Sequence, residues 1–530
     1  MGQHSLKKVL RMRDLVAYGL GGTIGAGIFV SIGVGAMQSG PALFLSFLLA
    51  SVACTISGVC FCEMASRVPA SGSSYSYTLS VFGRFPAFVI GSVVVVDCII
   101  SAAACARAWS SYVLIVIPIL PPWIFGNLSF PGVLQHVFSF SLLSGLLCLA
   151  IGLVLAQGIT QTTSFNNFST ILNGFVLAVF VLVGLPLTDP SNWTPFAPNG
   201  LAGIVRGSGR IFFSFLGFDV VNCLAEETEG VNKSMVPPAI LWTIGLTTIV
   251  YLLVSVAFVG LAPAWALDLS SPLSSAFAYR NMSSLSYLVG VGAVGNTLTS
   301  VLSNFLIQPR IVMKMASDGF LPSRFGDIDE NGVPRLALIT TVSLSALTAL
   351  LVDFETLADM VSVASLVSLS IVCFCVIKSR QNDLQYHGRN PIIFYASFVG
   401  IAVGLSLSLL YNWPRWLTIA FGLGIAVSLG MAIIFADKKS SDLTVFRVPL
   451  CPFLPLVGVL FNTYLLLGLP ALALVRAAIL FLTCSLIYWF KLRDSAPPPC
   501  SPNGDSLKSM RRISVVGNTY DSLETIADDQ

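Results

Sequence analysis

Long apolar runs constrain the fold of this chain more than any other feature of its sequence. Runs of about 20 residues with almost no charge recur along the chain, which has 530 residues, only 10% of them charged. Soluble globular proteins carry about 25% charged residues. A helix of about 20 apolar residues crosses the hydrocarbon of a bilayer, where every backbone polar group must be paired within the protein. The sequence therefore predicts an all-α polytopic membrane protein.

We predict about fourteen transmembrane helices. Their approximate ranges are 14–37, 41–64, 86–117, 138–157, 167–187, 206–227, 235–262, 285–316, 335–352, 355–377, 391–410, 416–435, 449–469 and 472–490. We predict that the chain begins with a short cytoplasmic segment, 1–13, and ends with a cytoplasmic tail, 492–530. Between them lie three groups of transmembrane helices, at 14–187, 206–410 and 416–491. The tail is rich in Pro, Ser, Asn and Asp, and such a composition predicts disorder.

The distribution of Lys and Arg predicts the orientation. With an even number of spans both termini lie on one side, and 22 of the 28 basic residues fall in segments on that side. Positive charge marks the cytoplasmic side, so we expect both termini to be cytoplasmic. The six exceptions are Arg107, Arg206, Arg210, Arg280, Arg415 and Arg476. Sequons in predicted outer loops permit glycosylation at Asn127, Asn192 and Asn281. The net charge of +3 does not indicate a nucleic-acid partner.

Two of the predicted spans are interrupted by glycines, at 21–29 and at 212–219, five spans apart. A broken helix leaves free N–H and C=O groups, which persist in a membrane only where they line a cavity. Breaks at corresponding positions in two halves of a chain indicate a transporter binding site near the midplane. The pattern predicts a carrier for a small zwitterion.

The first break has the composition of a backbone binding site. Gly25, Ala26 and Gly27 allow a ligand to approach the main chain closely. A half-helix resuming at Ala26 presents N–H groups that suit a carboxylate. Carbonyls near Thr23 and Ile24 suit an ammonium group. Close helix packing through small residues is the alternative interpretation.

The second break predicts a complementary half of the site. Carbonyls at Ser214, Phe215 and Leu216 are candidates for the substrate amine, and Gly217 supplies flexibility. The aromatic rings of Phe215 and Phe218 are candidates for closing over the substrate. We expect Asp219 to cap the half-helix that follows, a role that needs no substrate contact.

Asp97 is a carboxylate eleven residues into the third span, at a depth of about 16 Å. Charged groups at such depth are costly and usually functional, so Asp97 is a candidate cavity residue. Ser101 shares its helical face. The alternative is that Asp97 pairs with a hydroxyl or with Arg107, which lies nearer the outer surface and is able to snorkel there.

Charged residues near the inner ends of the spans form a candidate gate. They are Glu63, Arg67, Glu226 and Glu227, with Arg84 or Arg310 as possible partners. The alternative is that these residues are solvated helix ends. The twelve cysteines and three histidines show no metal-ligand spacing and no catalytic set. We therefore expect no metal, no cofactor and no enzymatic activity.

The chain resembles the amino acid–polyamine–organocation superfamily and, within it, the cationic amino acid transporter family. The resemblance covers Arg13 to Lys491. It rests on the segments 14–27, Gly40-Pro41-Ala42, 63–69, Gly72-Ser73-Ser74-Tyr75, 106–109, 215–219 with Glu226-Glu227, Pro309-Arg310, 315–319 and Val448-Pro449-Leu450.

This resemblance implies a five-plus-five inverted repeat, in which 14–187 is the first repeat and 206–410 holds the second repeat and one further helix. It implies that the backbone at 24–27 and 214–217 binds the amino acid moiety of the substrate. Proton-coupled bacterial relatives carry a lysine where this chain has Asn173, and a neutral residue cannot shuttle a proton. Leu224-Ala225 replaces the usual Thr-Gly, and the position of Asp97 varies among relatives, so the side-chain class of the substrate stays open.

The sequence thus predicts a sodium-independent facilitator or exchanger of cationic amino acids (arginine, lysine, ornithine) that works by alternating access. Its expected place is the plasma membrane or a vacuolar or lysosomal membrane. A carrier of neutral amino acids or polyamines is one alternative, and a non-transporting amino acid receptor is another.

Overall fold

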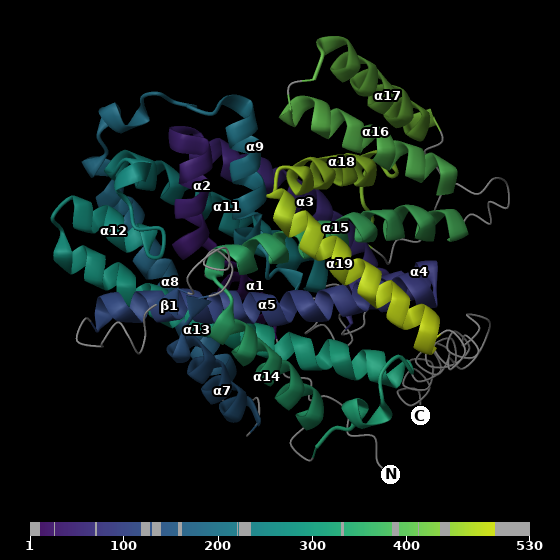
Figure 1. Cartoon of the computed structure of the whole chain (residues 1–530), viewed down its shortest axis with the longest axis horizontal. Helices are drawn as coiled ribbons and strands as arrows, with labels where there is room; N and C mark the ends of the chain where they lie inside the picture. The colour runs from purple at the N-terminus through teal and green to yellow at the C-terminus, as the bar shows by residue number, and fades with distance from the viewer. Residues whose placement is uncertain are drawn as a thin grey trace, which may run out of the picture.

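The computed structural model of the chain describes residues 11–25, 27–68, 72–117, 128–129, 139–156, 162–219, 221, 235–329, 333–383, 392–411, 413–434 and 446–492. These residues are almost entirely helical (Figure 1). The helices of the first half are α1 (Met12–Thr23), α2 (Ile32–Ser39), α3 (Leu43–Arg67), α4 (Ser73–Phe82), α5 (Arg84–Val116), α7 (Leu142–Ala156) and α8 (Thr162–Gly184). Those of the second half are α9 (Gly200–Ile211), α11 (Val236–Leu261), α12 (Pro272–Tyr279), α13 (Ser283–Ser317), α14 (Arg335–Leu351), α15 (Phe354–Asp383), α16 (Ile392–Leu410), α17 (Arg415–Ile434), α18 (Phe453–Leu467) and α19 (Ala471–Ile487).

Each of the fourteen predicted spans contains at least one of these helices. Seven helical stretches of the described chain are long and apolar enough to cross a membrane, and five shorter apolar helices accompany them. The all-α prediction is confirmed, with one small addition. Two strands of two residues each, β1 (Leu128–Ser129) and β2 (Ser139–Phe140), pair antiparallel. The number of helices that cross the membrane stays a prediction.

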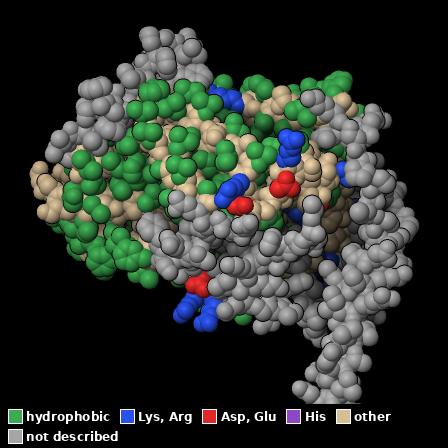
Figure 2. Space-filling view, turned by 90° about the horizontal axis from the view of Figure 1, so that it is seen from below, with side chains coloured by type: hydrophobic (Ala, Val, Ile, Leu, Met, Phe, Trp, Pro, Cys, Tyr) green, Lys and Arg blue, Asp and Glu red, His purple; other side chains and the backbone are tan. Residues whose placement is uncertain are grey.

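The surface has the character of a protein that faces lipid. Large apolar side chains point outward, with exposed fractions of 70% for Leu153, 74% for Ile171 and 84% for Phe490. Figure 2 shows a face on which hydrophobic side chains cover a broad area, while the charged side chains gather in a limited part of it. Water would oppose such exposure, whereas hydrocarbon favours it.

Helices at corresponding places in the two halves pack against each other. The pairs are α3 with α11, α5 with α13, and α7 with α14. In the order of predicted spans these are the second and seventh, the third and eighth, and the fourth and ninth, which is the pairing that an inverted repeat produces. Figure 1 shows α5 running through the middle of the molecule and α16 and α17 at its periphery.

Arg107 is buried, so the expectation that it snorkels to the surface is wrong. Its guanidinium donates to the carbonyls of Ala349 (2.5 Å), Leu350 (3.1 Å) and Ser139. Ala349 and Leu350 lie in the last turn of α14, where the carbonyls have no partner within their own helix. A cation at a helix C-terminus is also favoured by the helix dipole. Arg107 therefore caps α14 from inside the protein.

Glu63 is fully buried, and its partners differ from those predicted. Its carboxylate accepts from Arg67 (3.0 Å), from Arg380 of α15 (2.6 and 2.9 Å) and from the backbone N–H of Val448 (2.7 Å). The predicted pairing of Glu63 with Arg84 or Arg310 is therefore wrong. A buried carboxylate needs several donors, and these come from three segments of the chain. The network ties α3 to α15 and to the start of α18.

Of the other residues of the predicted gate, the structure describes only some. Arg84 lies over the ring of Phe320, with 4.7 Å from the guanidinium carbon to the ring centroid. Glu226 and Glu227 lie outside the described residues.

We expect Glu63→Gln to lower the free energy of unfolding by about 2 kcal/mol, because two arginines would then face a neutral amide. Asp329→Asn is the control, since it removes an ion pair whose partner Arg335 is 57% exposed, and it should cost less than about 0.5 kcal/mol. The measurement is the thermal unfolding midpoint of the purified protein in detergent. Equal midpoints for the two variants would contradict a structural role for Glu63.

Candidate functional site

The first predicted break is present in the structure. Helix α1 ends at Thr23, and Ile24 leaves the helical conformation with φ −75° and ψ 53°. The chain becomes helical again in a short π-helix, η1 (Gly27–Ser31), which leads into α2. Ala26, where the second half-helix was expected to resume, lies outside the described residues. The carbonyls of Thr23 and Ile24 are thus released from the regular helical pattern.

The second break is also present. Helix α9 ends at Ile211 and continues as one turn of 3₁₀-helix, η6 (Phe212–Phe215), after which Leu216 is extended. Gly217 has φ +122°, a conformation that side chains with a Cβ rarely adopt. The sequence predicted that Gly217 supplies flexibility, and the structure uses the glycine for a turn that other residues rarely make.

The two breaks touch each other through their backbones. A Cβ at Gly27 would lie 2.2 Å from Cα of Ser214, and a Cβ at Gly217 would lie 2.5 Å from the carbonyl carbon of Gly22. No side chain fits at such distances, so glycine is required on both sides of the contact. The contact brings together the two sets of released backbone groups.

Tyr251 of α11 connects the two breaks. Its hydroxyl lies 2.8 Å from the carbonyl oxygen of Thr23 and 2.7 Å from that of Ser214. A tyrosine hydroxyl has one proton, so it donates fully to only one of the two carbonyls at a time. The ring is buried and packs edge-on against Phe47 and Phe215, with centroid distances of 5.5 and 5.1 Å.

A chain of amides reaches the first break from the other side. Asn173 of α8 donates to Asn296 of α13 (2.5 Å), and Asn296 in turn donates to the carbonyl of Ile24. The hydroxyl of Ser300, one turn further along α13, lies 3.3 Å from the carbonyl of Gly21. Asn173 therefore supports the first break indirectly. The carbonyl of Ile24 keeps a second lone pair for another donor.

The predicted site residues of the two breaks lie together around this contact. Thr23, Ile24, Gly25, Gly27, Ser214, Phe215 and Phe218 are buried, and Leu216 and Gly217 are partly exposed. The ring of Phe215 is held by Phe47 and Tyr251, and that of Phe218 by Phe61 (5.6 Å). The hydroxyl oxygen of Ser214 is buried and has no hydrogen-bond partner among the described residues. It is an unused polar atom at the contact between the breaks.

Asp97 has one satisfied and one unsatisfied oxygen. Its Oδ2 accepts from Ser365 of α15 at 2.7 Å, whereas its buried Oδ1 has no hydrogen-bond partner within the described part of the chain. Pairing with a hydroxyl, which the sequence left open, is thus real but incomplete. Asp219, beyond the second break, lies within electrostatic range of Asp97. Ser101, one turn along α5, is partly exposed.

The expected capping role of Asp219 stays a prediction, because the structure describes only Val221 in the segment that follows it, up to Met235.

Helices α9 and α15 are tied together beside the second break. Arg210 pairs with Glu355 at 2.5 Å and lies 4.0 Å from Asp359. The ring of Phe213 contacts that of Phe354, with a centroid distance of 6.2 Å. These contacts hold the end of α9 and the start of η6 against the first turns of α15.

Sequence reasoning missed Tyr251, Asn296 and Ser365. Each is a polar residue within an apolar span, and that exception to the pattern was the available signal. Their partners lie from 37 to 272 residues away in sequence, a separation that no local spacing reveals.

The fold and the two interrupted helices are those of a polytopic membrane transporter. Comparison with known proteins agrees. A family model described as "Amino acid permease" matches residues 10–445, and one described as "C-terminus of AA_permease" matches residues 446–495. The chain belongs to the amino acid permease family, which consists of membrane transporters and not of enzymes.

The relatives carry different names. The chain is 31% identical to "Cationic amino acid transporter 4, vacuolar" of Arabidopsis thaliana, with 92% of each chain covered. It is 30% identical to "Branched-chain amino acid permease BcaP" of Bacillus subtilis, covering 83% of this chain and 95% of the relative. It is also 30% identical to the "Methylthioribose transporter" of Bacillus subtilis, covering 82% and 95%.

We expect Gly217→Ala to lower amino acid uptake by about tenfold or more, because the new Cβ would force the two breaks apart and strain the backbone. Gly245→Ala is the matched control, since a Cβ at Gly245 of α11 meets nothing within 4 Å. Uptake into proteoliposomes is measured at equal amounts of folded protein. Wild-type uptake by Gly217→Ala would show that the contact between the breaks is not needed for transport.

Proposed function

We propose that this protein is a sodium-independent carrier that binds the amino acid moiety of its substrate at the two breaks. The observation that carries this proposal is the backbone contact between them, with Gly27 against Ser214 and Gly217 against Gly22. Backbone groups recognise what all α-amino acids share, a carboxylate and an ammonium, and leave the side chain to other residues.

The charges of the substrate match the two kinds of backbone group. The start of η1, at Gly27, is a helix N-terminus whose N–H groups hold the carboxylate. The carbonyls of Ile24 and Ser214, with those of Phe215 and Leu216, accept from the ammonium. Thr23, Gly25 and Ala26 complete the first half of this site, and Gly217 and Phe218 the second.

We propose that Asp97, with Ser101 beside it, favours substrates with a cationic side chain such as arginine, lysine or ornithine. The unpartnered Oδ1 of Asp97 supports this role, because a buried carboxylate oxygen needs a donor. Burying such an ion pair gains little net affinity. Asp97 therefore acts mainly by discriminating between substrates.

The ties at the two ends of α15 suit alternating access. The ion pair of Arg210 with Glu355 closes α9 onto α15 at one end, and Glu63 with Arg380 closes α3 onto α15 at the other. With both termini cytoplasmic, the first tie lies at the outer mouth and the second, with Arg67, at the inner mouth. Transport requires each tie to open in turn.

Asn173 supports transport without proton coupling. Its amide is neutral and is engaged with Asn296, so it offers no group that carries a proton at this position. We therefore propose facilitated diffusion or exchange, in the plasma membrane or in a vacuolar or lysosomal membrane.

A neutral amino acid carrier is the second candidate, and the branched-chain permease among the relatives favours it. In that case the hydrogen bond from Ser365 to Asp97 is structural. A polyamine carrier is less well supported, because a polyamine has no carboxylate for the start of η1. An amino acid receptor without flux is a further alternative.

We expect labelled L-arginine to enter proteoliposomes faster when they are preloaded with unlabelled arginine or lysine, without a sodium or pH gradient. Substrate inside the vesicle speeds the return of the carrier, which an exchanger requires. Vesicles without protein and vesicles preloaded with leucine are the controls. If only preloaded leucine accelerated the uptake, the carrier would prefer neutral substrates. Binding of L-arginine without any uptake would favour an amino acid receptor.

We expect Asp97→Asn to reduce L-arginine uptake by about tenfold while L-leucine uptake changes by less than about twofold. The amide keeps the size of the side chain and removes its charge. Asp327→Asn, in the loop between α13 and α14, is the control and should leave both substrates unaffected. Equal losses of arginine and leucine uptake would refute a selective role for Asp97.

A further inference from the structure

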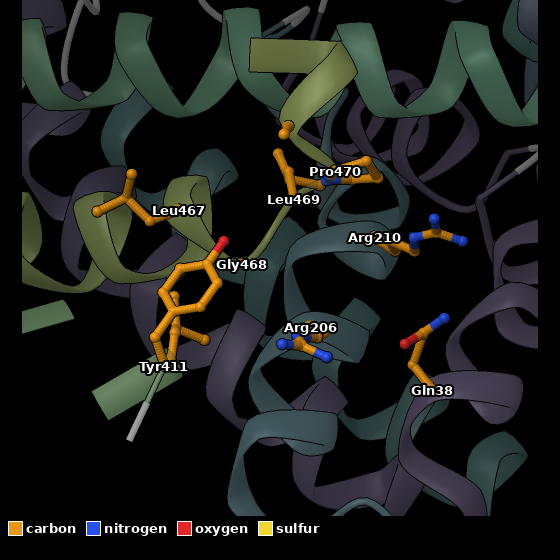
Figure 3. A pocket seen from close by; sticks show the side chains of 10 residues that line it. Gln38, Arg206, Arg210, Tyr411, Leu467, Gly468, Leu469 and Pro470 are labelled. Atoms are coloured by element: carbon orange, nitrogen blue, oxygen red, sulfur yellow. The ribbon is translucent and has the colours of Figure 1, made fainter. Parts of the chain in front are cut away.

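A second polar pocket lies away from the two breaks (Figure 3). It has a volume of about 260 Å³ and lies between the second half of α9, the end of α2, the end of α16 and the turn that joins α18 to α19. Arg206 and Arg210 of α9, Gln38 of α2 and Tyr411 after α16 supply its polar groups. Of its lining residues, only Arg210 has a part in the proposed transport function, through its ion pair with Glu355.

The two arginines of the pocket, Arg206 and Arg210, differ in how far their charge is neutralised. Both belong to the six arginines that break the charge bias of the sequence. Two others of the six, Arg107 and Arg280, lie away from the pocket and donate to carbonyl oxygens. Arg210 is paired with Glu355. Arg206 is exposed and has no hydrogen-bond or ion-pair partner among the described residues. The pocket therefore presents one unneutralised guanidinium beside one that is already paired.

Exposed aromatic side chains near the pocket indicate a membrane interface. It is bordered by the turns after α16 and α18, where one apolar helix ends and the next begins. Near the first turn, Tyr411 and Trp416 are 63% and 67% exposed, and Trp413 is exposed as well. Exposed tyrosine and tryptophan mark the headgroup region of a bilayer.

Part of the lining is apolar. Leu410, Leu467 and Leu469 line the pocket together with Pro470. A free inorganic anion gains nothing from such walls, whereas an amphiphile places its charged group on the arginine and its apolar part on the leucines. The combination favours a lipid over a dissolved ion.

We infer that this pocket binds the phosphate of a membrane phospholipid headgroup. Arg206 is the main phosphate ligand, because the planar guanidinium matches two phosphate oxygens at once. The hydroxyl of Tyr411 and the amide of Gln38 are the additional donors. The bound lipid lies against α9, the half-helix that leads into the second break, and so stabilises one position of that half-helix.

The test is native mass spectrometry of the full-length protein in detergent, titrated with phosphatidylglycerol. Wild type, Arg206→Ala and Arg206→Lys are compared with Arg415→Ala, which removes an exposed arginine that does not line the pocket. We expect Arg206→Ala to weaken the retention of one lipid by about tenfold. Arg206→Lys should be intermediate, because lysine keeps the charge and loses the two-pronged geometry. Arg415→Ala should match wild type.

Two results would overturn the inference. Retention by Arg206→Ala equal to wild type would show that the pocket does not hold the lipid, and an equal loss in Arg415→Ala would show an unspecific effect of surface charge. Inorganic phosphate is titrated separately by calorimetry. Binding of phosphate that depends on Arg206, without retention of the lipid, would assign the pocket to a free anion and overturn the lipid. Unchanged thermal midpoints of the variants exclude misfolding as the cause.

Discussion

The structure depends on hydrogen bonds to the backbone groups that the two interrupted helices leave free, because hydrocarbon offers these groups no partner. Both breaks release carbonyl groups within apolar spans, and they do so in contact with each other. Partners come from outside the broken helices, with Tyr251 from α11 and Asn296 from α13. The surrounding helices therefore supply the hydrogen bonds that water would supply in a soluble protein. Their packing determines which backbone groups of the breaks are paired.

Helix α15 makes polar contacts with three other helices, at three levels along its length. Near its start Glu355 pairs with Arg210 of α9, further along Ser365 bonds to Asp97 of α5, and near its end Arg380 binds Glu63 of α3. A helix held at three levels is suited to remain fixed while its partners move. The two end contacts are ion pairs that differ in exposure, since the side chain of Glu355 is half exposed whereas that of Glu63 is fully buried.

Much of the fold was predictable, because the signals were local. Apolar runs located the helices, and glycines such as Gly217 within those runs located the breaks. Apart from Arg67, the partners of Arg107 and Glu63 were not predictable, since they come from segments 32 to 385 residues away that only the folded chain brings close. Tyr251 was missed for the same reason. A tyrosine within a span has many possible partners, and the amino-acid sequence does not show that Tyr251 faces both breaks.

The hydroxyl of Tyr251 has a consequence for the balance between conformations. One proton faces two carbonyls at nearly equal distances, 2.8 and 2.7 Å, so two arrangements of similar energy differ only in the direction of one O–H bond. A second donor to one of these carbonyls weakens that oxygen as an acceptor for Tyr251, which shifts the preference of the proton toward the other carbonyl. Since the carbonyls belong to different breaks, such a choice favours one break over the other. The direction of this single O–H bond therefore depends on what else donates to the two carbonyls.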